Sequence, residues 1–154
     1  MTGSSAIGRG SIGREEIEKL IPHAGSMCLL DAVIDWAPSS IRCRAGSHRS
    51  ANNPLAAFGR LGAACGIEYA AQAMALHGGL TSGATTRPRG GYLASLRSLI
   101  LYRSRLDDLP GDILIEAERL SGEGSSVSYR FEISHDGERL VTGRAAVILD
   151  VEAV

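Results

Sequence analysis

A single long, almost uncharged segment stands between two groups of strand-like segments in this sequence. Residues 61–77 are rich in alanine and have the pattern of one helix, which we expect to close on Gly78 and Gly79. The strand-like segments after it are joined by short turns, whereas parallel neighbours would need crossover segments that the sequence lacks. The chain is therefore expected to form an antiparallel sheet that packs against one helix.

Six segments have the composition or the alternation of strands. Residues 126–134 alternate apolar and polar side chains, which indicates that one face of the sheet is buried. A short amphipathic helix over 14–23, stopped by Pro22, precedes all of them. The expected strands are 27–37, 39–48, 92–104, 112–120, 126–134 and 139–151.

The small side chains of the long helix suit a strongly curved sheet. They let the sheet approach closely, while Ile67 and Met74 supply apolar bulk. A curved antiparallel sheet of about six strands wrapped round one central helix is the α+β hotdog fold. Such a sheet has free edges, which side-by-side pairing into a dimer hides. The alanines concerned are Ala63, Ala64, Ala70, Ala71, Ala73 and Ala75.

The composition limits the classes of function. The 154 residues are 44% hydrophobic, enough for one packed core, and we expect a flexible lead at 1–13 followed by one domain at 14–154. A net charge of -1 argues against a nucleic-acid or polybasic membrane-surface protein. The sequence lacks a signal-peptide h-region and a run of roughly 18 apolar residues, so we expect a cytoplasmic protein with no membrane span.

Glu68 is the one carboxylate in the central stretch GIEYAAQAMALHGG, residues 66–79. A charged group in a buried helix is costly unless it is paired, hydrogen-bonded or protonated. Gln72 follows four residues later on the same helix face, so we expect its amide to orient the Glu68 side chain. The functional interpretation is a general acid or base. The alternative is a solvated carboxylate at the edge of the helix.

Several stretches resemble a known family. LIPHAGSMCLLDAVIDW, residues 20–36, is similar to the Pro-His-x-x-Pro-Met-x-Leu-Leu-Asp opening of the hotdog 3-hydroxyacyl acyl-carrier-protein dehydratases. IEYAAQA, residues 67–73, resembles their Glu-Ala-Met-Ala-Gln-Ala central-helix motif. The runs NPLAAFGRLGAACGIEYAAQAMALHGG and RLDDLPG resemble more closely the dehydratase-like proteins of aryl-polyene biosynthesis. The resemblance covers residues 16–150.

This resemblance implies dehydration of a 3-hydroxyacyl thioester to a trans-2-enoyl product, in fatty-acid or aryl-polyene type biosynthesis. A histidine and Glu68, contributed by opposite subunits, are implied to act together: the histidine takes the α-proton, and the carboxylate assists departure of the hydroxyl as water. Backbone N–H groups at the start of the helix, at the positions of Gly62 and Ala63, polarise the carbonyl. An acyl carrier protein holds the substrate on phosphopantetheine, and no further cofactor is implied.

The histidine position departs from the family pattern. The usual Gly-His-Phe-Pro-Gly segment places its histidine about fourteen residues before the acid, where this sequence has Pro54. The nearest candidate is His48, twenty residues before Glu68, at the end of the second expected strand. We assign His48 as the base, because a differently routed loop brings an imidazole to the same point. The alternative is an ordinary loop histidine next to Arg49.

The remaining reactive side chains are interpreted as structural. His23 ends the first helix, His77 meets the dipole of the long helix near its end, and His135 belongs to a hairpin. Cys65 is interpreted as core packing, because no histidine at helical spacing would activate it. The sequence shows no recognisable metal-ligand spacing, so no metal is expected.

A group of arginines follows the long helix. Its basic charge would suit an acidic acyl carrier protein, and we assign Arg87, Arg89 and Arg97 to contact with the carrier or its pantetheine arm. The alternative is a solvated strand face balanced by Asp107 and Asp108. The group is Arg87, Arg89, Arg97, Arg103 and Arg105.

Two other functions fit the same fold. One is thioester hydrolysis, with Glu68 activating water. The other is a catalytically weak subunit that pairs with an active hotdog partner, which the absence of the Gly-His-Phe-Pro-Gly segment favours. The expected assembly is accordingly either a homodimer or a heterodimer with another hotdog protein.

Overall fold

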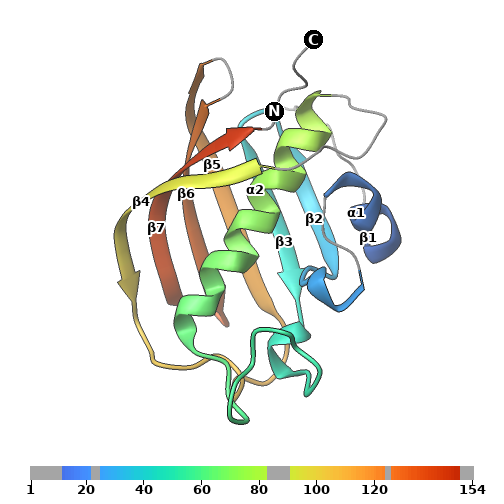
Figure 1. The fold of residues 1–154 in the computed structure, drawn as a ribbon, viewed down its shortest axis with the longest axis vertical. Coiled ribbons are helices and arrows are strands. Elements are labelled where there is room, and N and C mark those ends of the chain that lie inside the picture. The colour runs from blue at the N-terminus through green and yellow to red at the C-terminus, as the bar shows by residue number, and fades with distance from the viewer. Residues whose placement is uncertain (1–11, 22–24, 83–90, 124–125, 150–154) are drawn as a thin grey trace.

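The computed structural model describes residues 12–21, 25–82, 91–123 and 126–149. In these residues one antiparallel sheet of seven strands wraps round a long helix (Figure 1), with the strand order β1-β2-β3-β5-β6-β7-β4. The strands are β1 Ile12–Gly13, β2 Ala32–Ala37, β3 Ser40–Ala45, β4 Gly91–Leu101, β5 Ile113–Glu123, β6 Ser126–His135 and β7 Glu138–Leu149. The helices are α1 Arg14–Leu20 and α2 Gly66–Ser82, with 3-10 turns η1 Gly25–Met27, η2 Ser47–Arg49 and η3 Ala63–Cys65.

This arrangement confirms the hotdog architecture predicted from the sequence. The expectation of about six strands is one short, because β1 pairs with β2 at Ile12↔Val33 and Gly13↔Ala32. Residues 12 and 13 therefore belong to the sheet rather than to the flexible lead assigned to 1–13, and residues 1–11 lie outside the described residues.

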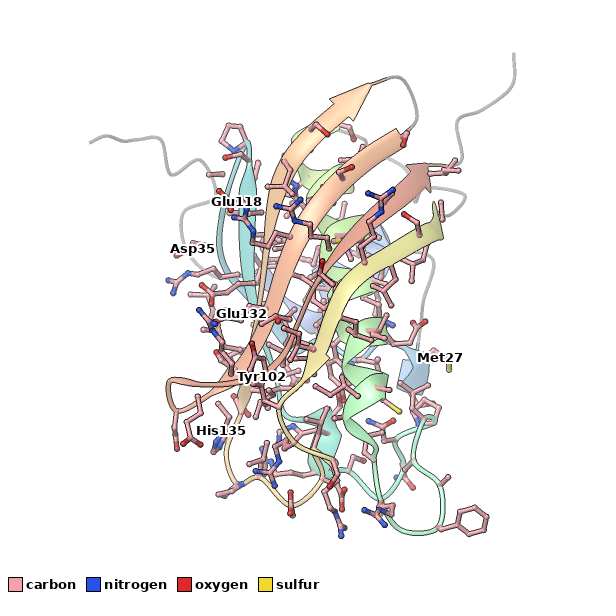
Figure 2. All side chains as sticks on the ribbon, turned by 90° about the vertical axis from the view of Figure 1, so that its left-hand side faces the viewer. Met27, Asp35, Tyr102, Glu118, Glu132 and His135 are labelled. Atoms are coloured by element: carbon pink, nitrogen blue, oxygen red, sulfur yellow. The ribbon has the colours of Figure 1, made fainter. Side chains whose placement is uncertain are left out.

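The alternation in the sequence sets the two faces of the sheet. Side chains that face α2 along β6, such as Tyr129 and Phe131, are buried, whereas the intervening Arg130 is exposed. Figure 2 shows Glu118 and Glu132 on the face of the sheet turned away from α2. The core therefore lies between the sheet and the helix, and the charged residues cover the outer face.

The long helix packs against the sheet through small and large side chains together. Ala70 and Ala73 are fully buried, as expected, while Tyr69, Met74 and Leu76 supply most of the bulk. Burial of each large side chain stabilises the fold by about 1.5–3 kcal/mol relative to leaving it exposed.

The predicted end of this helix at Gly78 and Gly79 is wrong, because α2 continues to Ser82. A Cβ at Gly79 would lie 3.4 Å from the backbone oxygen of Leu20. The glycine therefore serves close packing against α1 and not helix termination. The start also differs, since residues 63–65 form the turn η3 before α2 begins.

Candidate active site

A polar network fixes the turn η2 against the central helix. The Tyr69 hydroxyl, buried on α2, lies 2.8 Å from Ser47 Oγ, and Ser47 Oγ donates to the Leu29 carbonyl at 2.7 Å. Asn53 Nδ2 donates to the Ser47 carbonyl at 2.8 Å and to the Tyr69 oxygen at 3.0 Å. Burial raises the pKa of Tyr69, so its hydroxyl stays protonated and donates to Ser47. These bonds hold His48, the next residue, in one position.

His48 is 1% exposed and only one of its ring nitrogens has a partner. Nε2 lies 3.1 Å from the Leu109 carbonyl, and because a carbonyl only accepts, Nε2 carries the proton. In the neutral ring Nδ1 then holds the lone pair, and this buried atom makes no hydrogen bond. Burial lowers the pKa of His48, against the opposing effect of the bond to Leu109. The imidazole is therefore a neutral base with an unused lone pair near pH 7.

A pocket of about 400 Å³ lies beside this histidine. It is formed by the loop after η2 and by the loop that leads to α2, with Arg60 and Asp107 among its walls. Asp107 accepts from the Leu61 backbone N–H at 2.8 Å and pairs with Arg105. The Arg105 guanidinium, followed by the Leu61 N–H, holds the pKa of Asp107 far below its usual range. Asp107 is thus a fixed anion that anchors the loop, not a proton donor.

Glu68 lies in the first turn of α2 and is exposed within one chain. This matches the alternative of a solvated carboxylate rather than a buried one. Cys65 stands one turn earlier; burial raises the pKa of its thiol, and the charge of Glu68 adds to that effect. Glu68 is not among the residues around the His48 pocket. A single chain therefore does not bring Glu68 and His48 together.

The amide of Gln72 does not turn toward Glu68. Its Oε1 accepts from the Leu29 N–H at 2.9 Å, and its Nε2 donates to the Met27 carbonyl at 2.7 Å. Gln72 is 1% exposed, so both halves of the amide are used by the backbone of the segment before β2. The expected orienting role is corrected accordingly: Gln72 clamps this segment onto the helix.

The two backbone groups assigned to the thioester carbonyl differ in availability. The Ala63 N–H donates to the Ser104 carbonyl at 3.0 Å, because Gly62 and Arg105 form an isolated antiparallel bridge. The Gly62 N–H has no hydrogen-bond partner among the described residues. Of the two N–H groups, only that of Gly62 is therefore without a hydrogen-bond partner among the described residues.

The predicted carrier contacts fall in different places. Arg87 and Arg89 lie outside the described residues. Arg97 lies on β4 beside a hollow of about 190 Å³ that shares no residue with the His48 pocket. Arg103 and Arg105 form ion pairs with Asp108 and Asp107, as the alternative of a balanced face predicted.

The other histidines have structural partners where they are described. His77 is fully buried, with Nδ1 2.8 Å from the Tyr129 hydroxyl and Nε2 2.8 Å from the Ala37 carbonyl. His135 contacts the Pro110 carbonyl through Nε2. His23 lies outside the described residues. The sequence had no signal for the Tyr69 and Asn53 network, apart from the Asn-Asn-Pro turn that places Asn53.

Solved structures share this fold. The dehydratase heterocomplex ApeI:P from Xenorhabdus doucetiae matches with a TM-score of 0.79 and 24% identity, covering 88% of this chain and 91% of that chain. A hypothetical thioesterase with coenzyme A from Streptococcus pneumoniae matches with a TM-score of 0.56 and 12% identity, covering 79% and 87%. A mutant thioesterase from Pseudomonas aeruginosa has a TM-score of 0.56 and 14% identity, covering 76% and 78%. At these identities the likenesses show the fold alone.

The described residues contain neither a membrane-spanning helix nor a metal-binding cluster. No helix there is long and apolar enough to cross a membrane. The same part of the chain has no group of three or more His, Cys, Asp or Glu side chains that could hold a metal ion.

The family is given by the sequence as a whole. A search of curated proteins finds no match. A model of the ApeP-like family, described as ApeP dehydratase, matches residues 15–153, which is nearly the full length of the chain. The chain therefore belongs to the ApeP-like dehydratase family, with the hotdog fold seen in the structure.

Proposed function

We propose that this chain dehydrates 3-hydroxyacyl thioesters as one subunit of a two-chain hotdog enzyme, with His48 as the base and Glu68 as the acid. The observation that carries this proposal is the unpaired Nδ1 of buried His48 beside a pocket of about 400 Å³. Membership of the ApeP-like dehydratase family supplies the reaction class.

In the proposed chemistry the imidazole accepts a proton and the carboxyl group donates one. The lone pair on His48 Nδ1 removes the proton from C2 of the substrate, which the thioester carbonyl makes acidic. The C2 electrons form the double bond to C3 as the C3 hydroxyl leaves as water, protonated by the acid that shares the pocket: the partner's carboxylate beside His48, and Glu68 beside the partner's base. The Gly62 N–H donates to the carbonyl oxygen, where negative charge develops. Proton transfer from the imidazolium back to the carboxylate restores both groups.

This mechanism needs a second subunit. His48 and Glu68 do not line one pocket within a chain, and Glu68 is exposed. Contact with another hotdog chain would cover Glu68 and direct it to the partner's pocket, while the partner's acid meets His48. The Xenorhabdus structure, with a TM-score of 0.79, is named a dehydratase heterocomplex, which supports a heterodimer for this chain as well.

We assign carrier contact to the mouth of the His48 pocket. Arg60 is exposed there and makes no ion pair within the described part of the chain. Arg49, also at the pocket, lies 3.3 Å from Asp112 through its guanidinium. An acidic acyl carrier protein would meet uncompensated positive charge at Arg60, and its phosphopantetheine arm would enter beside His48.

A catalytically weak subunit is the second candidate. Two observations favour it: Pro54 stands where the family usually has its histidine, and the Ala63 N–H is occupied by Ser104. In that case this chain lends Glu68 to an active partner and shapes its acyl tunnel. His48 would then be dispensable.

Turnover of a carrier-bound 3-hydroxyacyl thioester tests the proposal. The full chain is assayed alone and with an ApeI-type hotdog subunit, and products are separated as 3-hydroxyacyl, trans-2-enoyl or free acid. We expect the enoyl product with both subunits present, reduced at least 100-fold by His48→Ala and by Glu68→Gln. His135→Gln, a histidine of the β6–β7 hairpin, is the matched control and should retain activity.

The outcomes separate the candidates. Loss with Glu68→Gln but full activity with His48→Ala would reject the proposed base and support the weak-subunit function. Release of free acid would identify a thioesterase. Unchanged activity in both variants would remove this pair from the mechanism altogether.

A further inference from the structure

One edge of the sheet is long and apolar. β4 ends the strand order, and no described strand pairs with its outer side. Leu93, Leu99, Ile100 and Leu101 on this strand are between 37% and 48% exposed. The opposite edge, β1, has two residues. Because long apolar edges are normally covered in native proteins, β4 is the edge that a partner strand would occupy.

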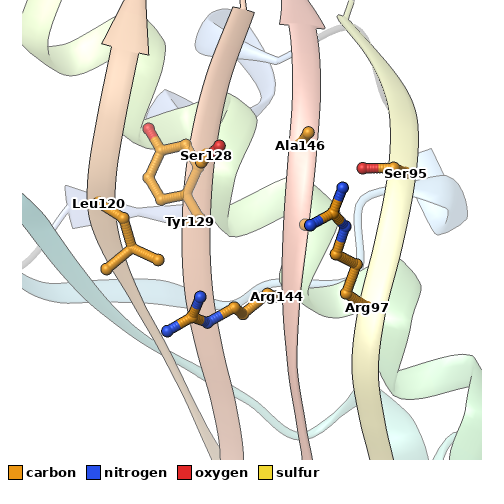
Figure 3. A pocket seen from close by; sticks show the side chains of 8 residues that line it. Ser95, Arg97, Leu120, Ser128, Tyr129, Arg144 and Ala146 are labelled. Atoms are coloured by element: carbon orange, nitrogen blue, oxygen red, sulfur yellow. The ribbon is translucent and has the colours of Figure 1, made fainter.

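A row of cations crosses the outer face of the sheet to this edge. Arg97 on β4 stands opposite Arg144 on β7, and Arg144 stands opposite Arg130 on β6. Arg130 is neutralised by Glu118 at 2.8 Å. Arg97 and Arg144 have no ion pair within the described residues, and like charges directly opposite each other destabilise a sheet. Figure 3 shows both side chains at the hollow on this face.

Pairing of two copies through this edge would increase the repulsion between these arginines. A two-fold axis brings the same residues of both strands together. With full overlap of the two β4 strands, Arg97 lies opposite Ser95 of the second copy, and the two Arg97 residues are diagonal neighbours about 7–8 Å apart. Arg144 of each copy lies one strand further, about 4.8 Å behind. The two Arg97 positions, and each Arg97 with its own Arg144, would thus lie within roughly one Debye length of about 8 Å, and β4 contains no acidic residue.

We propose that Arg97 and Arg144 select the strand that pairs with β4, favouring a hotdog partner with an acidic edge strand over a second copy of this chain. This inference rests on the proposed two-chain enzyme, and it adds which charge on the partner's edge strand is accepted. The apolar residues of β4 supply affinity to any strand, whereas the two arginines set which strand is accepted. Repulsion against the wrong partner is a common source of specificity.

Reversal of the charge at Arg97 tests the selection directly. In the Arg97→Glu chain, each new carboxylate lies opposite Arg144 of its own chain, so the row of four side chains carries no net charge and self-association should strengthen about ten-fold. The same variant should bind the ApeI-type subunit at least ten-fold more weakly than the wild type. Dissociation constants are measured by analytical ultracentrifugation and by surface capture, at low and at raised salt, because salt should shrink both changes.

Two further chains make the result specific. Lys19→Glu changes the net charge equally on α1, at the other end of the sheet (Figure 1), and should alter neither dissociation constant. The double variant Arg97→Glu/Arg144→Glu should pair with the wild-type chain in preference to pairing with itself. Thermal melting confirms that each variant is folded before binding is measured.

The proposal fails if Arg97→Glu shifts both dissociation constants in the same direction, or neither. It also fails if the variant loses only binding of an acyl carrier protein, which would assign the arginines to the carrier instead. None of these measurements requires turnover, so charge selection and dehydration are judged separately. Selective pairing without turnover would reject the enzyme and keep the interface.

Discussion

Two buried histidines at different places in the core make the same first hydrogen bond and differ in the second. His48 and His77 each donate from Nε2 to a backbone carbonyl, at 3.1 Å and 2.8 Å. His77 Nδ1 then accepts from the Tyr129 hydroxyl, whereas His48 Nδ1 has no partner. A buried polar atom without a hydrogen bond is rare in native proteins. The comparison separates a histidine whose two ring nitrogens are both hydrogen-bonded in the core from one that has a buried nitrogen without a partner.

The surroundings of the two rings follow the same division. His77 lies where α2 packs closely on the sheet, and the rings of His77 and Tyr129 meet edge to face with centroids 5.6 Å apart. His48 lies in the short turn η2 beside a pocket. His77 thus belongs to the packed core, whereas His48 lies at the wall of a pocket.

The largest expected effect is a loss of stability on truncation of His77. His77→Ala leaves the Tyr129 hydroxyl and the Ala37 carbonyl without partners and opens a cavity, so the free energy of unfolding should fall by about 3 kcal/mol. His48→Ala also opens a cavity but leaves only the Leu109 carbonyl without a partner, so it should cost less, about 2 kcal/mol. Urea unfolding followed by circular dichroism measures both.

The control for this pair is Tyr129→Phe, which removes only the hydroxyl that meets His77 Nδ1. It should cost about 1–2 kcal/mol, because one buried acceptor loses its donor. Equal losses for His48→Ala and His77→Ala would contradict the division between the two histidines.

The next effect concerns Gln72 and Glu68, which lie one turn apart on α2. Gln72→Ala removes the clamp on Leu29 and Met27 and should lower the free energy of unfolding by about 2 kcal/mol. Glu68→Gln, at an exposed position, should change it by less than about 0.5 kcal/mol. Chemical denaturation of the two variants checks this. A large loss for Glu68→Gln would mean that the carboxylate has a structural partner within one chain.

The sequence predicted the sheet and the helix because both depend on patterns that a single chain displays. Alternation along residues 126–134 marks a half-buried strand, and short turns exclude parallel neighbours. The strand count was one short because Ile12 and Gly13 pair through two residues, too few for any pattern. The end of α2 was misplaced because Gly79 packs closely against Leu20 of α1, a contact that the sequence pattern of the helix does not show.

The candidate site depends on contacts that the sequence does not display. His48 is the nearest histidine before the helix, but the proton on its Nε2, and with it the lone pair on Nδ1, is set by the carbonyl of Leu109, far along the chain. Gln72 has the right spacing for Glu68, yet the backbone of residues 27–29, brought by the fold, competes for its amide. A carboxylate on an apolar helix looked buried, although α2 has an open side at Glu68 within one chain.

A smaller effect should appear with pH, since burial lowers the pKa of both His48 and His77. In the unfolded chain these imidazoles take up protons near pH 6.5, while the folded chain resists protonation. The unfolded state therefore binds more protons as the pH falls, and the free energy of unfolding should decrease from pH 7 toward pH 5.

Urea midpoints at pH 7 and pH 5 measure this loss. His48→Gln should reduce it, because one of the two resisting groups is gone. The carboxylate of Asp107, whose pKa is held far below its usual range by Arg105, stays ionised throughout this window. An unchanged pH dependence in His48→Gln would show that His48 is solvated in the folded chain.

The smallest expected effect is a gain in stability from a substitution in the loop beside the His48 pocket. Phe58 and Gly59 join residues 57 and 60 through a two-residue turn, with φ of 54° and 75°. Phe58 is fully exposed, so its ring contributes no burial to offset the left-handed backbone. Asn is favoured at the first position of such a turn, and Phe58→Asn should raise the free energy of unfolding by about 0.5–1 kcal/mol. Gly59→Ala, measured by the same urea titration, should lower it. A loss of stability in Phe58→Asn would mean that the ring packs on the chain. The loop beside His48 would then be part of the packed core.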